Sequence, residues 1–464
     1  MCMEVKLVLG LWQQHQNGDH SKVCTQVNLG SGTTEGKMPP KGKDKGKGKG
    51  KGKGKGKPDP AALQGVVKKL LKTYDKNCNL NNSAMAPNIR KAMQTAIEDE
   101  KVLTKFILEP LVTEKEGDLP VLFEPFIASL RQERYHYIRD LHVWDYPVNY
   151  ENMASFGLFL EKDFYKLRTI EFMDCLLEPL SIRRLSKALV CCDHMTILNL
   201  DYNEFGDEGA KHLSAGLTDN VTLLSLSLCY CDLGVASGQH VGRVVSTTAV
   251  REVFLDGNNL ESEGAMELIK LLVDQAEYEA FQRAEDVRLK AEEKALKAQE
   301  EKGNRYTSGT GTDVSGDEGG DKSRPESGKK KKKKKKGKKG KKKKGPPPPP
   351  AAGPWIHKLH LADNGIDSLG DGGSFVPIIC MRLFKKLLSH CQCLEELDLE
   401  DNLIGEVGGR EIMDGLSHRM KEKMGGVKVR TTHRMTADTF NSIVKLGSGA
   451  LKKKKGKKGK KKKK

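Results

Sequence analysis

A short pattern of apolar positions recurs along the chain. It reads apolar, two other residues, apolar, one other, apolar, two others, Asn or Cys, one other, apolar. Its clearest copies are Met195-Leu198-Leu200-Asn203-Phe205, Leu223-Leu226-Leu228-Cys231-Leu233, Ile356-Leu359-Leu361-Asn364-Ile366 and Leu394-Leu397-Leu399-Asn402-Ile404. Close copies are Leu167-Ile170-Phe172-Cys175-Leu177 and Val250-Val253-Leu255-Asn258-Leu260, and a degenerate one is Ile138-Leu141-Val143-Tyr146-Val148. The Asn or Cys positions 175, 203, 231 and 258 lie 28, 28 and 27 residues apart, a register that indicates a true repeat.

Each copy predicts a short strand, a bend and a helix. Leu198 and Leu200 alternate as the buried side of a strand. Asn203 follows at the bend, where a buried amide can hydrogen-bond backbone groups of neighbouring turns. Leu213 and Leu217 then lie at helical spacing. Because one unit cannot bury its own apolar side, the units are expected to stack as a solenoid.

This pattern resembles the leucine-rich-repeat family, specifically its long-repeat, ribonuclease-inhibitor-like class. The run from Leu198 to Ala210, LNLDYNEFGDEGA, carries the resemblance, which covers about 135–275 and 355–445. It implies an α/β solenoid with the form of a horseshoe and partners bound on its concave strand face. The family includes inhibitors, receptors, GTPase activators and cytoskeletal scaffolds, so the resemblance implies binding without identifying the partner.

Composition changes divide the chain into six predicted parts. These are a disordered Lys/Gly-rich tail (1–57), a helical N-terminal cap (58–134), repeats (135–275), an insert (276–354), repeats with a C-terminal cap (355–445) and a poly-Lys tail (446–464). Residues 1–37, which precede Met38, are expected to be an upstream extension of low structural content.

The insert follows from a gap in the repeat spacing. Asn258 and Asn364 are 106 residues apart, one repeat plus about 78 residues. A charged helix is predicted at about 276–302, with i,i+4 pairs Glu279–Arg283 and Glu293–Lys297, as a lone surface helix or, alternatively, a coiled-coil partner. A disordered poly-Lys and poly-Pro linker is expected to follow, in which the prolines are a stiff spacer or a ligand for a proline-binding groove.

Two smaller irregularities come later in the chain. Asn364 and Asn402 are 38 residues apart, which places an extra loop around Asp367–Pro377. Val427 and Val429 indicate a closing strand.

The net charge of +18 is concentrated in three lysine tracts. Residues 41–57, 329–344 and 452–464 together hold 34 lysines and one aspartate, so the rest of the chain carries a net charge of −15. The tracts are predicted to bind polyanions or acidic filament surfaces, or alternatively to be solvated tails with nonspecific affinity. They have no interleaved aromatic residues, which argues against sequence-specific nucleic-acid recognition. Their composition is also similar to that of axonemal leucine-rich-repeat proteins.

The side chains that alternate outward along the predicted strands are rich in acids. Eight are acidic and one is Lys, which predicts a docking face for a basic, partly apolar protein surface. The candidate partner-binding residues are Trp144, Glu171, Asp201, Glu252, Phe254, Asp256, Glu396, Asp398 and Glu400. Alternatively, the acids only keep the sheet soluble, or the chain's own lysine tracts occupy them.

Motifs for catalysis are incomplete. Gly32–Met38 resembles a phosphate loop, but Ser31 replaces the first Gly and Met38 the Ser or Thr that holds magnesium. Cys229-Tyr230-Cys231 and Cys391-Gln392-Cys393 have no partner pair at zinc-site spacing, so structural cysteines are favoured. The sequence therefore predicts no enzyme, no cofactor and no metal.

The cysteine count and the absence of a long apolar run suggest a setting for the chain. Eleven scattered cysteines predict a reducing, intracellular compartment, and no run approaches the roughly 20 apolar residues of a membrane span. We therefore expect a non-enzymatic scaffold in the cytoplasm, in a ciliary or cytoskeletal assembly. The alternative is an RNA-associated or nuclear protein bound mainly through its lysine tracts.

Overall fold

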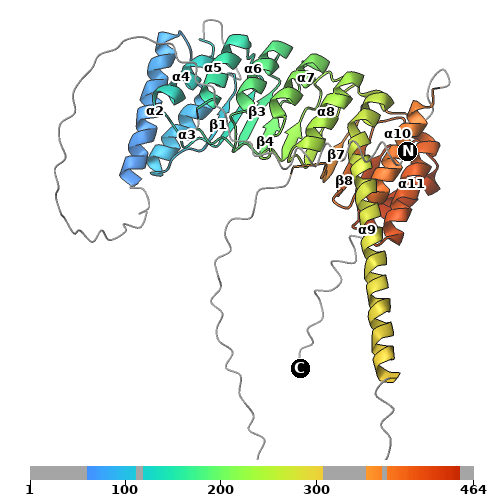
Figure 1. The fold of residues 1–464 in the computed structure, drawn as a ribbon. Helices are drawn as coiled ribbons and strands as arrows, with labels where there is room; N and C mark the ends of the chain where they lie inside the picture. Colours follow the sequence, from blue (N-terminus) through green and yellow to red (C-terminus); the bar gives the residue numbers. More distant parts are fainter. Residues whose placement is uncertain (1–59, 111–118, 163, 307–351, 368–373, 450–464) are drawn as a thin grey trace, which may run out of the picture. The chain divides into compact units, whose positions relative to one another are not determined.

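The computed structural model describes residues 60–110, 119–162, 164–306, 352–367 and 374–449. Within them, strands β1 to β9 form one parallel sheet in which every strand lies beside its neighbours in sequence. Figure 1 shows the helices along one side of this row of strands. The predicted α/β solenoid is confirmed.

The strands are three to five residues long. They are β1 (Lys105–Leu108), β2 (Asp140–Trp144), β3 (Thr169–Met173), β4 (Ile197–Asn199), β5 (Ser225–Ser227), β6 (Glu252–Phe254), β7 (Lys358–His360), β8 (Glu396–Leu399) and β9 (Lys428–Thr431). The closing strand predicted from Val427 and Val429 is β9.

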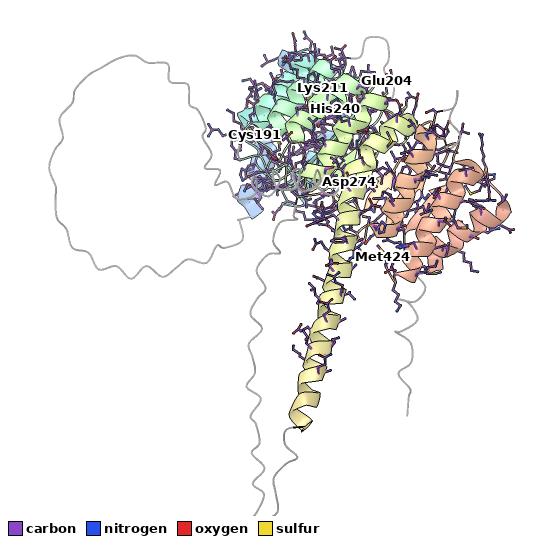
Figure 2. The ribbon with its side chains drawn as sticks, turned by 45° about the vertical axis from the view of Figure 1, so that its right-hand side comes forward. Cys191, Glu204, Lys211, His240, Asp274 and Met424 are labelled. Carbon is purple, nitrogen blue, oxygen red and sulfur yellow. The ribbon has the colours of Figure 1, made fainter. Side chains whose placement is uncertain are left out.

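Helices precede, connect and follow these strands. They are α2 (Pro60–Leu80), α3 (Pro87–Glu98), α4 (Phe123–Gln132), α5 (Tyr150–Leu160), α6 (Pro179–Leu189), α7 (Gly206–Leu217), α8 (Val235–Thr247), α9 (Glu261–Tyr306), α10 (Val376–His390), α11 (Gly405–Lys421) and α12 (Ala437–Gly449). Figure 2 shows Lys211 of α7, His240 of α8 and Asp274 of α9 on successive helices of this layer.

The apolar frame of the repeat forms the buried side of the sheet. One residue from each of β1 to β8 lies opposite the next in register, and each is at most 1% exposed. These residues are Phe106, Leu141, Ile170, Leu198, Leu226, Val253, Leu359 and Leu397. Because strand side chains alternate between the two sides, their neighbours point away from the helices.

The Asn of the frame joins consecutive units. The Asn203 side-chain oxygen accepts hydrogen bonds from the backbone N–H groups of Cys175 and Leu177, at 3.0 and 3.1 Å. Its amide nitrogen donates to the carbonyls of Phe172 and Leu200, both at 2.8 Å. The predicted role of the buried amide is therefore confirmed.

The region expected to be a helical cap also contributes a strand. Residues 58–134 contain α2, α3 and α4, but β1 lies between α3 and α4 and pairs with β2. The prediction for this region contained only helices and did not include β1. The apolar run Phe106–Leu108 is so short that the spacing of its apolar residues does not distinguish a strand from a helix.

The insert does not interrupt the sheet. Strands β6 and β7 pair directly, with Val253 opposite Leu359. The predicted charged helix is continuous with the helix of the preceding repeat, so that α9 spans 46 residues. Its Glu279–Arg283 and Glu293–Lys297 pairs form, at 3.7 and 2.5 Å. The three lysine tracts, the proline run and most of the loop expected around Asp367–Pro377 lie outside the described residues.

Candidate functional site

The side of the sheet opposite the helices presents three rows of side chains, which we call the open face. In the first row, strand by strand, are Lys105, Asp140, Thr169, Ile197, Ser225, Glu252, Lys358, Glu396 and Lys428. In the second are Ile107, His142, Glu171, Asn199, Ser227, Phe254, His360, Asp398 and Arg430. The third follows at the strand ends and includes Trp144, Met173, Asp201, Cys229, Asp256, Ala362 and Glu400.

The first row alternates in charge over β6 to β9. The Lys358 ammonium is 2.7 Å from the Glu252 carboxylate, and the Lys428 ammonium is 2.5 Å from that of Glu396. The hydrogen bond to Glu252 raises the pKa of Lys358. Glu252 and Glu396, two predicted partner-binding residues, are therefore already neutralised by neighbouring strands.

The second row continues this pairing. The Arg430 guanidinium lies 2.9 Å from the Asp398 carboxylate, which is only 3% exposed. His360 lies between Asp256 and Glu396, at 3.8 and 3.7 Å, and its ring meets that of Phe254 edge-on. Phe254 and Asp398 thus belong to an internal network rather than to a free surface.

The predicted residues near the N-terminal strands are also engaged. The Trp144 indole N–H donates to Glu171, whose other carboxylate oxygen is 3.3 Å from His142 Nδ1. His142, the largest contributor, and Trp144 lower the pKa of Glu171 despite its burial.

Two predicted aspartates hold the ends of neighbouring strands. Asp201 accepts hydrogen bonds from the Ser227 hydroxyl and the Cys229 backbone N–H, both at 2.7 Å. Burial raises the pKa of Asp201. Asp256 accepts from the Ala362 backbone N–H at 2.8 Å. Both carboxylates thus connect the end of one strand to the next strand.

The open face is consequently less acidic than the sequence indicated. The sequence count omitted β1 and β9, which bring Lys105, Lys428 and Arg430 to the rows. Among the nine predicted residues, Glu400 is an exposed carboxylate for which the described residues offer no ion pair. Whether any of the nine binds a partner stays a prediction.

A more exposed acidic row lies one residue beyond the third row. We call it the strand-end row, and its members are Asp145, Asp174, Tyr202, Tyr230, Gly257, Asp363 and Asp401. Their φ values lie between 50° and 69°. The backbone N–H group of each of the first six members donates to a carbonyl of the next repeat unit, at 2.8 to 3.1 Å. These hydrogen bonds hold the members side by side in the order given.

Two tyrosines form the centre of the strand-end row. The rings of Tyr202 and Tyr230 stack with centroids 4.9 Å apart and planes within 6°, although each side chain is about half exposed. A side chain at Gly257 would place its Cβ 2.2 Å from the Tyr230 ring, so glycine makes room for the stack. Left-handed backbone is unfavourable for tyrosine, which makes the pair unusual.

Aspartates flank the tyrosine stack. Asp145 and Asp174 precede it, Asp363 and Asp401 follow it, and all four are exposed. None forms an ion pair with another residue in the ranges that the structure covers. Partial burial raises the pKa of the Tyr230 phenol, and Coulombic interactions with Tyr202, Asp363 and Asp256 add to this effect.

The sequence reasoning missed this row although a signal was present. Each member immediately precedes the Asn or Cys of the frame, or the Tyr that replaces it. Strand alternation assigns only the residues within a strand, whereas these residues stand at the bend.

The described residues contain no assembled metal site. No group of three or more His, Cys, Asp or Glu side chains in them is placed to hold a metal ion. Cys175 and Cys231 occupy the Asn position of the frame, where each sulfur lies 3.2 to 3.4 Å from backbone carbonyls. None of the described helices combines the length and apolar character that crossing a bilayer requires.

Comparison with known protein families agrees with the repeat. The family model described as Leucine Rich repeat matches residues 191–214 and 390–413. The first match contains β4 and the second contains β8, so the matches fall on both sides of the insert. No curated protein matches the chain.

Proposed function

Because the chain contains leucine-rich repeats, we propose that it is a non-enzymatic scaffold that binds a basic protein surface along the strand-end row. The observation that carries the proposal is the half-exposed Tyr202–Tyr230 stack between four exposed aspartates. Strands alternating with helices at 27- to 28-residue spacing support the long-repeat class.

The chemistry of the row favours arginine and lysine side chains. Tyrosine is enriched in protein interfaces, because its large ring is ordered at low entropic cost. Stacked rings can receive a guanidinium group by cation–π attraction, and neighbouring carboxylates add charge complementarity. The same carboxylates repel phosphate, which disfavours nucleic acid at this row.

The lysine tracts supply a second, separate contact in this proposal. They lie outside the described residues, so only their composition argues for an anchoring role toward acidic surfaces. We extend the proposal to a cytoplasmic, ciliary or cytoskeletal assembly on the resemblance of these tracts to axonemal proteins.

The test uses the full chain and a fluorescent arginine-rich peptide as the probe. Changing Tyr202→Ser and Tyr230→Ser together should weaken binding at least about tenfold, because hot-spot aromatics account for most of an interface's energy. The matched control is Tyr278→Ser on α9, where the tyrosine is 41% exposed and lies outside the sheet. Anisotropy titrations at two salt concentrations give the dissociation constants.

Charge reversal provides a second arm. Asp174→Lys with Asp363→Lys should also weaken binding, whereas Asp219→Lys at the end of α7 should not. Reversal at Glu396 or Asp398 is less informative, because both carboxylates are ion-paired within the sheet. The docking function would be refuted if the tyrosine and aspartate variants both bound the peptide with unchanged affinity. Loss of RNA binding only on removal of the lysine tracts would then favour the RNA-associated alternative.

A further inference from the structure

The chain has two Cys-X-Cys motifs, and their surroundings differ. In the first, the Cys231 sulfur lies 3.2 Å from the Leu200 carbonyl, and the Cys229 sulfur lies 3.7 Å from the Ser227 hydroxyl. Burial raises the pKa of the Cys229 thiol to about 12. These thiols are protonated at neutral pH and are engaged by other groups, so they are expected to be inert.

In the second motif the two thiols contact each other. The sulfur atoms of Cys391 and Cys393 are 3.5 Å apart, in the turn between α10 and β8. Cys391 is 4% exposed and Cys393 is half-buried, so Cys393 is the more accessible residue of the two.

A buried arginine lies beneath this turn. Arg419 of α11 is 2% exposed and donates only to backbone carbonyls, with no carboxylate paired to it in the described chain. Its acceptors, at 2.5 to 3.5 Å, are the carbonyls of Leu388, Cys391, Gln392, Leu394 and Gly425. A buried cation without a formal counter-charge is costly, and a thiolate at Cys391 would supply one.

The turn is built to stabilise that thiolate. A hydrogen bond from Cys393 is the largest cause that lowers the pKa of Cys391 to about 7; the Leu394 backbone N–H and the Arg419 charge add to it, and together they outweigh burial. Cys391 caps the C-terminus of α10, where carbonyl dipoles would oppose a negative charge. Arg419 occupies two of these carbonyls, at Leu388 and Cys391, and offsets their effect.

Two other charged groups face the pair from neighbouring elements. The hydrogen bond to Cys391 and burial raise the pKa of Cys393 most, and the charge of Glu279 on α9 adds to this. Arg251, next to β6, carries a positive charge near the Cys393 thiol. The proton between the sulfurs therefore stays on Cys393 most of the time. When that proton transfers to Cys391, the thiolate forms on Cys393, the more accessible residue of the pair.

We propose that Cys391 and Cys393 are a reversible redox pair that a low-molecular-weight disulfide of the glutathione type oxidises to an intramolecular disulfide. The Cys393 thiolate attacks one sulfur of that disulfide and releases one thiolate. The Cys391 thiolate then attacks the Cys393 sulfur and releases the second. Two protein thiols and one small disulfide yield one protein disulfide and two small thiols, and the two protein protons leave with them.

Geometry makes this bond possible and readily reversible. The sulfurs must approach from 3.5 Å to about 2.05 Å, a movement that side-chain rotation within the turn can provide. A disulfide across one intervening residue closes a very short loop. Such bonds are strained and more easily reduced, as regulatory disulfides are.

The experiment incubates the full chain with graded ratios of oxidised and reduced glutathione, traps free thiols by alkylation and maps the peptides by mass spectrometry. We expect the Cys391–Cys393 peptide to lose two hydrogens and to escape alkylation, with at least about tenfold more disulfide than the Cys229–Cys231 peptide. In the reduced chain, the alkylation rate of this pair should rise at lower pH than that of the Cys229–Cys231 pair.

The Cys391→Ser variant tests the second step. Without the resolving thiol, glutathione should remain attached to Cys393, whereas the native chain should release it. Disulfide formation at Cys391–Cys393 and at Cys229–Cys231 is compared within the native chain. This comparison therefore tests the proposal even if the Cys391→Ser variant is unstable. Two alkylated thiols at all ratios, or a lasting glutathione adduct on Cys393 in the native chain, would overturn it.

Discussion

Residue 203 shows what the frame position requires. Its amide both accepts and donates, and it connects four backbone groups of two consecutive units. Cysteine at positions 175 and 231 donates to carbonyls but offers only a weak acceptor. The two residue types are therefore not equivalent, although both fit the sequence frame.

Replacing Asn203 with Ala should lower the free energy of unfolding by about 2–4 kcal/mol, because buried N–H and C=O groups lose their partners. Asn203→Cys should cost less than Ala, since the thiol retains a donor. Urea denaturation followed by circular dichroism measures both changes. Asn259→Ala, an exposed neighbour of the frame position Asn258, serves as the control and should change stability by less than about 0.5 kcal/mol. Equal stability of Asn203→Ala and the native chain would contradict the assigned role.

Individual residues also show where sequence reasoning ends. The buried positions Leu198 and Leu226 could be predicted, because alternation fixes their side of the strand. The pairing of Asp398 with Arg430 could not, since it depends on β9 lying beside β8 across 32 residues of sequence. The tyrosine stack depends on the left-handed bend and on Gly257, which no periodicity encodes.

Strands β6 to β9 act together as a charge-paired element. Glu396 contacts Lys428, Arg430 and His360 from the strands on either side. Burial by itself would raise the pKa of Glu396, but Lys428, with His360 and Arg430, lowers it below its usual 4.5. A carboxylate whose pKa is lower in the folded state stabilises the fold above its unfolded pKa, and this stabilisation is lost as pH falls through the folded pKa.

Acidification from about pH 6 to about pH 3 should therefore lower the melting temperature more for the native chain than for Glu396→Gln, by roughly 1–3 °C. Differential scanning fluorimetry across this range measures the difference. Glu204→Gln, in the exposed turn before α7 (Figure 2), should follow the native profile. Parallel profiles for the native chain and Glu396→Gln would show that the ion pairs contribute no net stability.

Helix α9 illustrates prediction at the scale of an element. Its charged half could be predicted from the i,i+4 pairs, but its union with the repeat helix could not, because the composition changes near residue 276. Tertiary contacts explain the continuity. Glu277 pairs with Lys386 at 3.1 Å, and Arg283 donates to the His390 carbonyl at 3.0 Å, so α10 holds α9 beyond the repeat boundary.

In the whole molecule, positive charge is concentrated in the lysine tracts, and the rest of the chain has a net negative charge. The lysine tracts hold 34 positive charges, and the remaining chain has a net charge of −15. With this distribution, we expect the acidic part of the chain to attract the lysine tracts as well as basic partners. The strand-end row, with four exposed aspartates, is the part of the described surface where such competition is expected.

Replacing residues 329–344 with a Gly/Ser segment of equal length should raise the affinity of the arginine-rich peptide by about tenfold at low salt, because a tethered competitor is removed. At about 0.5 M salt the difference should vanish, since screening weakens both interactions. Anisotropy titrations of the two chains measure the effect. The same replacement of residues 41–57 by a Gly/Ser segment shows whether a lysine tract at another position in the sequence changes the peptide affinity equally. Equal affinities at low salt would show that the 329–344 tract does not occupy the row.

The length of α9 has a mechanical consequence. At about 1.5 Å per residue, the helix spans roughly 70 Å, and its side chains from Asp286 to Gln299 are exposed. One end is clamped between α8 and α10, as Figure 1 shows, while the other extends past the repeats. From Asp286 to Tyr306 the helix extends about 30 Å, so a rotation of about 5° at the clamp would move its free end by about 3 Å. The exposed half of α9 therefore places Tyr306, its last residue, well away from the sheet.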